Sequence, residues 1–210
     1  MTALAAETAA MRWQVRSQDR LRESVGVLHD MAAAKVKPQL DADSMRFVAA
    51  SPYVCVATSD GHGSVDASPR GDEPGFVKML DPTTLAIPER PGNRIADTLT
   101  NLLDHSGVGL LFLVPGCPEA LRVNGQARIV DGPSELLQAM AARGREPKLT
   151  IVVDIEQVYM HCGRAAQRSR IWDRDMSWTD PRPDLLIGNF LGISEEDSRN
   201  LLAAYNDDDL

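Results

Sequence analysis

Residues 53–87 have the sequence YVCVATSDGHGSVDASPRGDEPGFVKMLDPTTLAI, and this stretch indicates the fold. Its strand-forming residues come in short runs separated by turn residues. Residues 53–58 and 64–68 flank one turn, and residues 76–80 and 84–87 flank a second. Each pair predicts a β-hairpin, because short runs of strand formers bounded by Gly, Asp, Pro and Ser are typical of antiparallel strands joined by tight turns. The sheet is therefore expected to be antiparallel.

Three further strands are predicted after residue 106. Residues 107–114 are almost entirely apolar, which is typical of a central strand covered on both faces. Residues 119–131 and 148–159 form two longer runs. Six or seven strands with sparse helices do not fit an alternating βα fold. We therefore predict a mainly β (α+β) fold, an antiparallel split β-barrel with peripheral helices, in which closure of the barrel removes the sheet edges.

Two helices are predicted before the first strand. Residues 3–29 contain no proline and predict an amphipathic helix, with apolar positions at Met11, Val15, Leu21, Val25 and Leu28. A short helix should follow, with Asp41 or Asp43 as its N-cap, and should end before Ser51-Pro52. Its inward-facing residues are expected to be Met45, Phe47 and Val48.

Further helices are predicted within and after the sheet. Residues 93–105 place Ile95, Leu99, Leu102 and Leu103 on one helical face. Residues 133–143 follow Asp131-Gly132 and begin with a proline, which suits the first helical position. A short helix is expected after residue 160, and a final helix should begin after Ser194, with Glu195 and Glu196 in its first turn.

We divide the chain into three parts. Residues 1–40 are a helical extension, residues 41–175 the split barrel, and residues 176–210 a C-terminal extension. The last part and the stretch before it are rich in large side chains for a region outside a core. We expect it to lie against the barrel or a partner subunit.

Composition excludes several classes of function. The 210 residues are 43% hydrophobic and 25% charged, as in an ordinary globular protein. With 22 basic and 30 acidic residues, the net charge of −8 opposes attraction to nucleic acid or to anionic membranes. Residues 1–10 lack the basic start of a secretory signal, and the longest apolar run, Gly107–Val114, is too short to span a bilayer. A cytoplasmic location is expected.

Cysteine and histidine usage predicts no metal site. Cys55, Cys117 and Cys162 lack C-x-x-C spacing and are expected to be free thiols, with Cys55 buried in a strand. The four histidines have no metal-ligand spacing. No catalytic residue can be named from these groups.

The segment from Ile87 to Ile95, IPERPGNRI, predicts an anion site. A strand end leads into a Pro/Gly turn, and Asn93 would cap a helix whose unpaired N–H groups face that turn, with Arg90 and Arg94 nearby. Amide donors, the positive end of the helix dipole and two guanidinium groups suit a phosphate. The alternative is that Asn93 is only a cap and that the arginines pair with Glu89 and Asp97 at the surface.

A second segment, residues 65–76 (VDASPRGDEPGF), predicts a rigid loop after a strand. Its prolines and glycines fix the backbone and would present Ser68, Arg70 and Asp72 to a ligand. The alternative is a plain connection between the hairpins. Both segments should lie at the ends of adjacent strands, so they could line one cleft.

Three longer motifs carry a family resemblance. They are ASPRGDEPGFVKMLDPTTLAIPERPGNRIADTLTNLLDHSGVGLLFLVPG (67–116), EALRVNGQARIV (119–130) and HCGRAAQRSRIW (161–172). In this order they resemble the pyridoxamine 5′-phosphate oxidase-like superfamily of flavin-binding split barrels, and within it a bacterial subgroup described as FMN-dependent. The match covers residues 45–175. The resemblance implies a homodimer with one FMN in each of two clefts shared between subunits.

The resemblance also implies a set of cofactor-binding residues. Ser68, Pro69 and Arg70 match the strand beside the flavin ring and ribityl chain, and Ile87 and Pro88 match the next strand. The phosphate-binding turn of the family is matched by Arg90, Asn93 and Arg94. The C-terminal stretch that approaches the cofactor from the other subunit is matched by Ser169 and Trp172. The arginine and histidine pattern that holds pyridoxamine phosphate is not visible after residue 172, so the substrate is not carried over.

These observations lead to an FMN-dependent oxidoreductase acting on an unidentified small molecule, with NADH or NADPH as a candidate electron donor. A non-enzymatic flavin carrier or sensor would use the same pocket. A deazaflavin-binding or haem-binding relative is a further alternative. No nucleic acid and no membrane partner is expected.

Overall fold

The computed structural model describes residues 14–92, 94–131, 135–176 and 186–209. The chain forms two compact units, Met1–Val36 and Lys37–Leu210. Within the described residues, none of the helices has the length and apolar character needed to cross a membrane.

In the first unit, the prediction of a single long helix over residues 3–29 is wrong for the described residues, 14–29. Helix α2 spans Gln18–Val25, is capped by Ser17 and ends at Gly26, where φ is 80°. Helix α3, Asp30–Ala34, follows. Glycine adopts this left-handed conformation without steric penalty, so the chain turns there instead of continuing as a helix. The start of the predicted helix, with Met11, lies outside the described residues.

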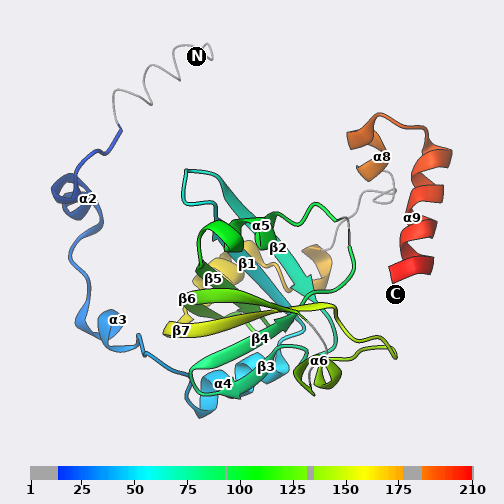
Figure 1. The fold of residues 1–210 in the computed structure, drawn as a ribbon. Helices are drawn as coiled ribbons and strands as arrows, with labels where there is room; N and C mark the ends of the chain where they lie inside the picture. Colours follow the sequence, from blue (N-terminus) through cyan, green and yellow to red (C-terminus); the bar gives the residue numbers. More distant parts are fainter. Residues whose placement is uncertain (1–13, 93, 132–134, 177–185, 210) are drawn as a thin grey trace, which may run out of the picture. The chain divides into compact units, whose positions relative to one another are not determined.

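The second unit is built on one seven-stranded antiparallel sheet with the order β2-β1-β5-β6-β7-β4-β3 (Figure 1). The strands are β1 Tyr53–Ser59, β2 Val65–Gly71, β3 Lys78–Asp81, β4 Thr84–Pro88, β5 Gly107–Leu113, β6 Ala120–Asp131 and β7 Leu149–His161. Both predicted hairpins and all three longer strands are confirmed. The fold is a split barrel, but its sheet does not close, because β2 and β3 remain as edge strands.

The curled sheet surrounds a single main core. Alternate residues of the strands point into it, because successive side chains of a strand face opposite sides. Val56, Phe112, Leu121 and Ile151 are fully buried there, and they come from β1, β5, β6 and β7. A smaller cluster unites Ala86, Met140 and Val152 beside helix α6, Glu135–Ala139. The Pro133 start predicted for this helix lies outside the described residues.

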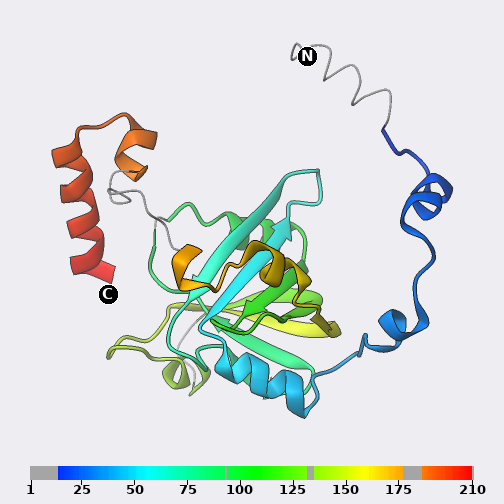
Figure 2. The same ribbon diagram turned by 180° about the vertical axis from the view of Figure 1, so that it is seen from behind.

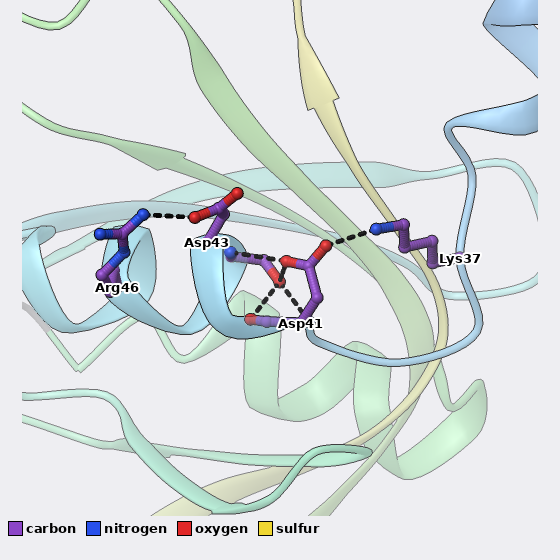
Figure 3. Close-up of polar contacts among 5 residues, drawn as sticks. Lys37, Asp41, Asp43 and Arg46 are labelled. Atoms are coloured by element: carbon purple, nitrogen blue, oxygen red, sulfur yellow. Dashed lines mark hydrogen bonds and ion pairs between the residues drawn. The ribbon is translucent and has the colours of Figure 1, made fainter.

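Helix α4, Ala42–Ala50, begins as predicted at Asp41 (Figure 3). The Asp41 carboxylate accepts a hydrogen bond from the Ser44 N–H at 2.9 Å, and Ser44 Oγ accepts one from the Asp41 N–H at 2.7 Å. Ion pairs join Lys37 to Asp41 and Arg46 to Asp43. The hydrogen bonds, from Lys37 first and then from Ser44, hold the pKa of Asp41 well below its usual range. The cap and the Lys37–Asp41 ion pair therefore fix the beginning of the second unit against the start of α4.

Helix α5 starts later than predicted. It spans Asp97–Asp104, and Ala96, at its N-cap position, has a left-handed backbone with φ 63°. The predicted start at Asn93 is therefore wrong, although Asn93 itself lies outside the described residues. Leu102 is buried as expected, whereas Ile95 precedes the helix and is 64% exposed and Leu103 is 78% exposed.

The long β6–β7 pair contains a register shift between Asn124 and Gly125. A Cβ atom at Gly125 would lie 2.0 Å from the carbonyl oxygen of Asp154. A glycine is therefore required at this point of the sheet.

The remaining helices follow β7. They are α7 Arg164–Ser169, a short 3-10 helix η1 Arg174–Met176, α8 Leu186–Leu191 and α9 Glu195–Asp209. The predicted Ser194 cap of the last helix is confirmed, since Ser194 Oγ accepts a hydrogen bond from the Asp197 N–H at 3.1 Å. Figure 2 shows α7, in gold, in front of the sheet strands β1 and β5.

Candidate functional site

Strand β2 carries the first group of predicted residues. Ser68 and Arg70 alternate along it with Asp66, which was not predicted as a site residue, so all three share one side of the strand. Ser68 Oγ and Thr98 Oγ1 each donate a hydrogen bond to Asp66 Oδ2 at 2.8 Å. Because Thr98 is in the first turn of α5, this shared carboxylate fixes the start of that helix beside β2.

Two ion pairs connect the end of β2 with the segment after β4. Arg70 lies against Glu89 with both guanidinium–carboxylate distances at 3.0 Å, and Arg90 Nε lies 2.7 Å from Asp72 Oδ2. We call these four residues, Arg70, Asp72, Glu89 and Arg90, the seam. The alternative in which Arg90 or Arg94 pairs with Glu89 is not observed, because Arg70 pairs with that carboxylate and Arg90 pairs with Asp72. The two predicted segments do meet, but through side chains, since β2 and β4 are not neighbours in the sheet.

Burial changes the chemistry of the seam. The side chains of Arg70 and Glu89 are 18% and 21% exposed. Burial raises the pKa of Glu89 and outweighs the attraction of Arg70, which lowers it. Arg70 Nε is a buried donor without a hydrogen-bond partner in the described part of the chain. A buried donor of this kind is costly unless an acceptor is supplied.

The seam borders a small cavity of about 240 Å³. Its charged lining residues are the cations Lys78, Arg90 and Arg143 and the carboxylates Asp72 and Glu73. The Lys78 ammonium donates to the Gly75 carbonyl at 2.9 Å. The cavity is smaller than the usual 300 to 1,000 Å³ of small-molecule pockets, so it suits a polar end group better than a whole flavin.

Ile87 and Pro88 are buried at the end of β4. Ile87 pairs with Ile151 and Pro88 with Thr150 on β7. The Ile87 carbonyl also accepts a hydrogen bond from Thr150 Oγ1 at 2.9 Å. These contacts therefore fix the end of β4, from which the segment with Glu89 and Arg90 continues.

Arg94 lies just before α5 and is exposed, with φ 62°. Among the described residues it has no ion pair, so the alternative pairing with Asp97 is not observed there. The residue at the N-cap position, Ala96, makes no side-chain capping hydrogen bond to α5 in the described part of the chain. The first amides of an α-helix have no partners within the helix, so Arg94 adjoins a set of available donors.

The last two predicted residues lie elsewhere. Ser169 and Trp172 line a larger pocket of about 650 Å³ on the outer face of β1, β5 and β6, beside α7. Trp172 Nε1 is buried without a partner in the described residues. None of the predicted residues on β2, on β4 or in the seam lines this pocket. Pro69 is the partner of Cys55 in the pairing of β1 with β2, and Cys55 does line the pocket. Cys55 is half-buried, not fully buried as predicted.

Sequence reasoning named Ser169 and Trp172 of this pocket but missed the sheet face that forms the rest of it. Its lining includes small residues on the outer face of the sheet, Cys55, Ala57 and Gly109, where side chains would otherwise fill the space. The available signal was the strand at residues 107–114, which is apolar on both faces. An outer face without polar residues predicts a covered or ligand-binding surface.

The donors beside α5 fit a phosphate monoester. Arg94 offers a guanidinium without an ion pair among the described residues, and the N-cap residue Ala96 makes no side-chain hydrogen bond to the start of α5. Arg70 on β2 adds a buried Nε that lacks a partner in the described part of the chain and could serve another acceptor of the same ligand. Guanidinium groups and helix N-termini are the groups that proteins use to bind phosphate. By contrast, the described residues contain no cluster of three metal-ligating side chains.

Comparison with solved structures finds proteins of low similarity to this chain. HupZ of Group A Streptococcus is 18% identical, with a TM-score of 0.47 over 58% of this chain and 93% of that protein. A candidate pyridoxamine 5′-phosphate oxidase from Lactobacillus delbrueckii is 19% identical, with a TM-score of 0.45 over 59% and 95%. An FMN-binding protein from Syntrophomonas wolfei is 11% identical, with a TM-score of 0.42 over 69% and 96%.

No curated protein matches the chain. Residues 40–162, more than half of the sequence and all seven strands of the sheet, match the family described as pyridoxamine 5′-phosphate oxidase. The chain therefore belongs to the pyridoxamine 5′-phosphate oxidase family.

Proposed function

We propose that this protein is an FMN-dependent oxidoreductase that acts on a small molecule. The observation that carries the proposal is the set of unsatisfied donors beside β2 and α5 in a member of this family: the buried Arg70 Nε, the Arg94 guanidinium and the uncapped helix start. Arg94 and the helix start suit the phosphate end of FMN, and Arg70 Nε suits its ribityl chain. The flavin ring, when bound, supplies the redox chemistry by accepting and passing on a hydride.

The protein residues position and tune the cofactor. Arg94 and the first amides of α5 would bind the phosphate, with Arg90 adding positive charge from the seam. Arg70 would donate from Nε toward the ribityl chain while Glu89 holds its other nitrogens. Asp66 keeps Ser68 and Thr98 in fixed orientations through its two 2.8 Å hydrogen bonds. Such fixed donors need little rearrangement on binding.

We also propose that the active form is a homodimer. Ser169 and Trp172 line the outer pocket, whereas the other described cofactor residues lie on β2, at the end of β4 or in the chain just after it. Both sets can contact the same flavin if one set comes from a second copy. Trp172 has an aromatic face and a buried N–H without a partner among the described residues, which suits contact with a ring system that carries acceptors.

The absorption spectrum of the purified protein tests the cofactor, together with mass spectrometry of the ligand released on denaturation. FMN is expected. A deazaflavin or a haem, or failure of the apoprotein to bind added FMN, would contradict the proposal. Reduction of the bound flavin by NADH or NADPH, followed by turnover with oxygen or a dye, separates an oxidoreductase from a carrier. Light scattering of the FMN-loaded protein should give twice the mass of one chain.

A further inference from the structure

Arg122 lies on the outer face of the sheet and lines the 650 Å³ pocket beside α7. It is on β6, with Leu111 on β5 and Tyr159 on β7 as its cross-strand partners. Its guanidinium carbon lies 5.2 Å from the centre of the Tyr159 ring, a distance typical of a cation–π contact. The ring therefore holds the guanidinium at the pocket but supplies no negative charge to neutralise it.

The surroundings of Arg122 provide no counter-ion. It has no ion pair within the described ranges, and the described residues lining the pocket include no Asp or Glu. Arg128, on the same strand but outside the pocket, does pair with a carboxylate, that of Asp154. Most of the lining is apolar or small, and a charge acts more strongly in such surroundings than in water. A negative charge that arose in this pocket would therefore be stabilised by Arg122.

FMN carries negative charge in two places. The phosphate is charged in both redox states and, in the proposed function, on which this inference rests, it lies at Arg94 and the start of α5. Neither of these lines the pocket. The second charge arises only on reduction. A hydride forms a bond to N5 of the ring, and its electron pair leaves one negative charge shared by N1 and the C2 carbonyl oxygen of the pyrimidine part.

We propose that Arg122 stabilises this negative charge of the reduced flavin ring. In the proposed homodimer, Ser169 and Trp172 bring the pocket of one copy to the flavin held by the other, and Arg122 lines the same pocket. The oxidised ring is neutral and gains little from the cation, whereas the reduced ring is an anion and gains much. Arg122 therefore raises the reduction potential of the bound flavin and makes it a better hydride acceptor.

The reduction potential of the FMN-loaded protein, measured by spectroscopic titration against a reference dye, tests the proposal. Arg122→Gln should weaken the binding of reduced FMN about tenfold or more, the scale of a hydrogen bond to a charged group, and change that of oxidised FMN less than about threefold. A tenfold loss for reduced FMN alone lowers the potential of a two-electron couple by about 30 mV. Arg122→Lys should retain most of the wild-type potential. Arg128→Gln is the matched control on the same strand and should leave the potential unchanged.

Sulfite gives a second measurement that needs neither a substrate nor an electron donor. The lone pair on its sulfur forms a bond to N5 of the oxidised flavin, and the displaced electron pair leaves a negative charge at N1 and the C2 carbonyl oxygen. The adduct therefore has the same ring charge as the reduced flavin. Loss of the visible flavin absorption reports its formation. Arg122→Gln should weaken sulfite addition about tenfold or more, whereas Arg128→Gln should leave it unchanged.

Tyr159 is the positioning residue of this pair. Tyr159→Phe retains the aromatic ring and should leave the potential and the sulfite affinity unchanged. Tyr159→Leu removes the ring and should weaken both reduced FMN and sulfite by about two- to fivefold, in the same direction as Arg122→Gln. Equal values for Tyr159→Leu and the wild type would show that the ring does not position Arg122.

The outcomes separate this inference from the proposed function. A wild-type protein that does not bind FMN contradicts the proposed function and this inference with it. If FMN binds to the wild type and to folded Arg122→Gln, as judged by circular dichroism, with equal potentials and equal sulfite affinities, only the role of Arg122 is overturned. Equal shifts in Arg122→Gln and Arg128→Gln would show an effect of net charge and would also overturn it. If Arg122→Gln does not fold, Tyr159→Leu carries the test.

Discussion

The guanidinium of Arg70 lies 3.0 Å from the carboxylate of Glu89 at both of its terminal nitrogens, and this pair links opposite parts of the sheet. Arg70 is on the edge strand β2, whereas Glu89 directly follows β4, and four strands lie between β2 and β4 in the sheet order. The barrel is therefore held together here by side chains. Since the same residues lie where the cofactor is proposed to bind, the stability of the seam and the chemistry of the site are connected.

Removing one partner of this pair should destabilise the protein. Arg70→Met leaves the Glu89 carboxylate largely buried without its cation, and we expect a loss of about 2 to 3 kcal/mol, because an unpaired charge of limited exposure is costly. The double variant Arg70→Met/Glu89→Gln should recover part of that loss. Urea denaturation of the wild type, both single variants and the double variant gives the coupling energy. Additive effects would show that the two side chains do not interact.

The raised pKa of Glu89 predicts a pH dependence of stability. A carboxyl group with a higher pKa in the folded state contributes stability below its unfolded pKa of about 4.3, and this contribution is lost as the pH rises through the folded pKa. Glu89→Gln should flatten the free energy of unfolding across that window. Denaturant titrations between pH 4 and 7 measure the difference. A wild-type advantage in stability over Glu89→Gln that grows as the pH rises would contradict the assigned direction of the shift.

The Asp41 cap predicts a pH dependence of stability in the opposite direction. Its lowered pKa means that its contribution is present above the unfolded pKa of about 3.9 and is lost as the pH falls through the lower folded value. Asp41→Ala should reduce the free energy of unfolding by about 1 kcal/mol near neutral pH, the usual value of an N-cap. Asp43→Ala, in the same turn but 77% exposed, should cost less than about 0.5 kcal/mol. Thermal unfolding ranks the two variants.

The close contact at Gly125 predicts that one added methyl group will strongly destabilise the fold. A Cβ atom there would collide with the Asp154 carbonyl, so Gly125→Ala must separate β6 from β7 locally. We expect a loss of about 3 kcal/mol, at the upper end for overpacking. Gly92→Ala is the control, because nothing lies within 4 Å of the added atom. Equal melting temperatures for the two variants would mean that the sheet accommodates the methyl group.

Arg94 tests the phosphate assignment. Arg94→Ala should weaken FMN binding by about 1.5 to 3 kcal/mol, the scale of a charge-assisted hydrogen bond, with riboflavin binding almost unchanged. Quenching of flavin fluorescence measures both affinities. Arg128→Ala removes an arginine that already pairs with Asp154 and should change neither. Equal losses for FMN and riboflavin in Arg94→Ala would place the phosphate elsewhere.

The hairpins and capped helices could be predicted because their causes are local. Turn residues delimit β1 to β4, and Asp41 and Ser194 cap the helices that follow them. The start of α5 could not be predicted, because the left-handed backbones at Arg94 and Ala96 interrupt a sequence with helical periodicity. Such conformations of residues other than glycine cost energy locally and depend on the surrounding structure.

The sequence predicted residues that lie in the site, but not which arginine forms an ion pair with which carboxylate. Sequence placed Arg70 and Arg90 in it, yet which arginine pairs with which carboxylate depends on how the sheet curls, and the curl is a property of the whole barrel. The sheet face of the 650 Å³ pocket beside α7 was missed for a related reason. Its walls come from β1, β5, β6 and α7, and only the assembled sheet brings these segments together.

Strand β2 is an edge strand, so Arg70 and Asp72 can separate from Glu89 and Arg90 without breaking the backbone hydrogen bonds that join β1 to β2. Local opening at such a joint requires less free energy than unfolding of the core. We therefore expect a flavin to be loaded into the finished protein rather than built in during synthesis. Removal of the cofactor and its later restoration to the folded protein should therefore be reversible.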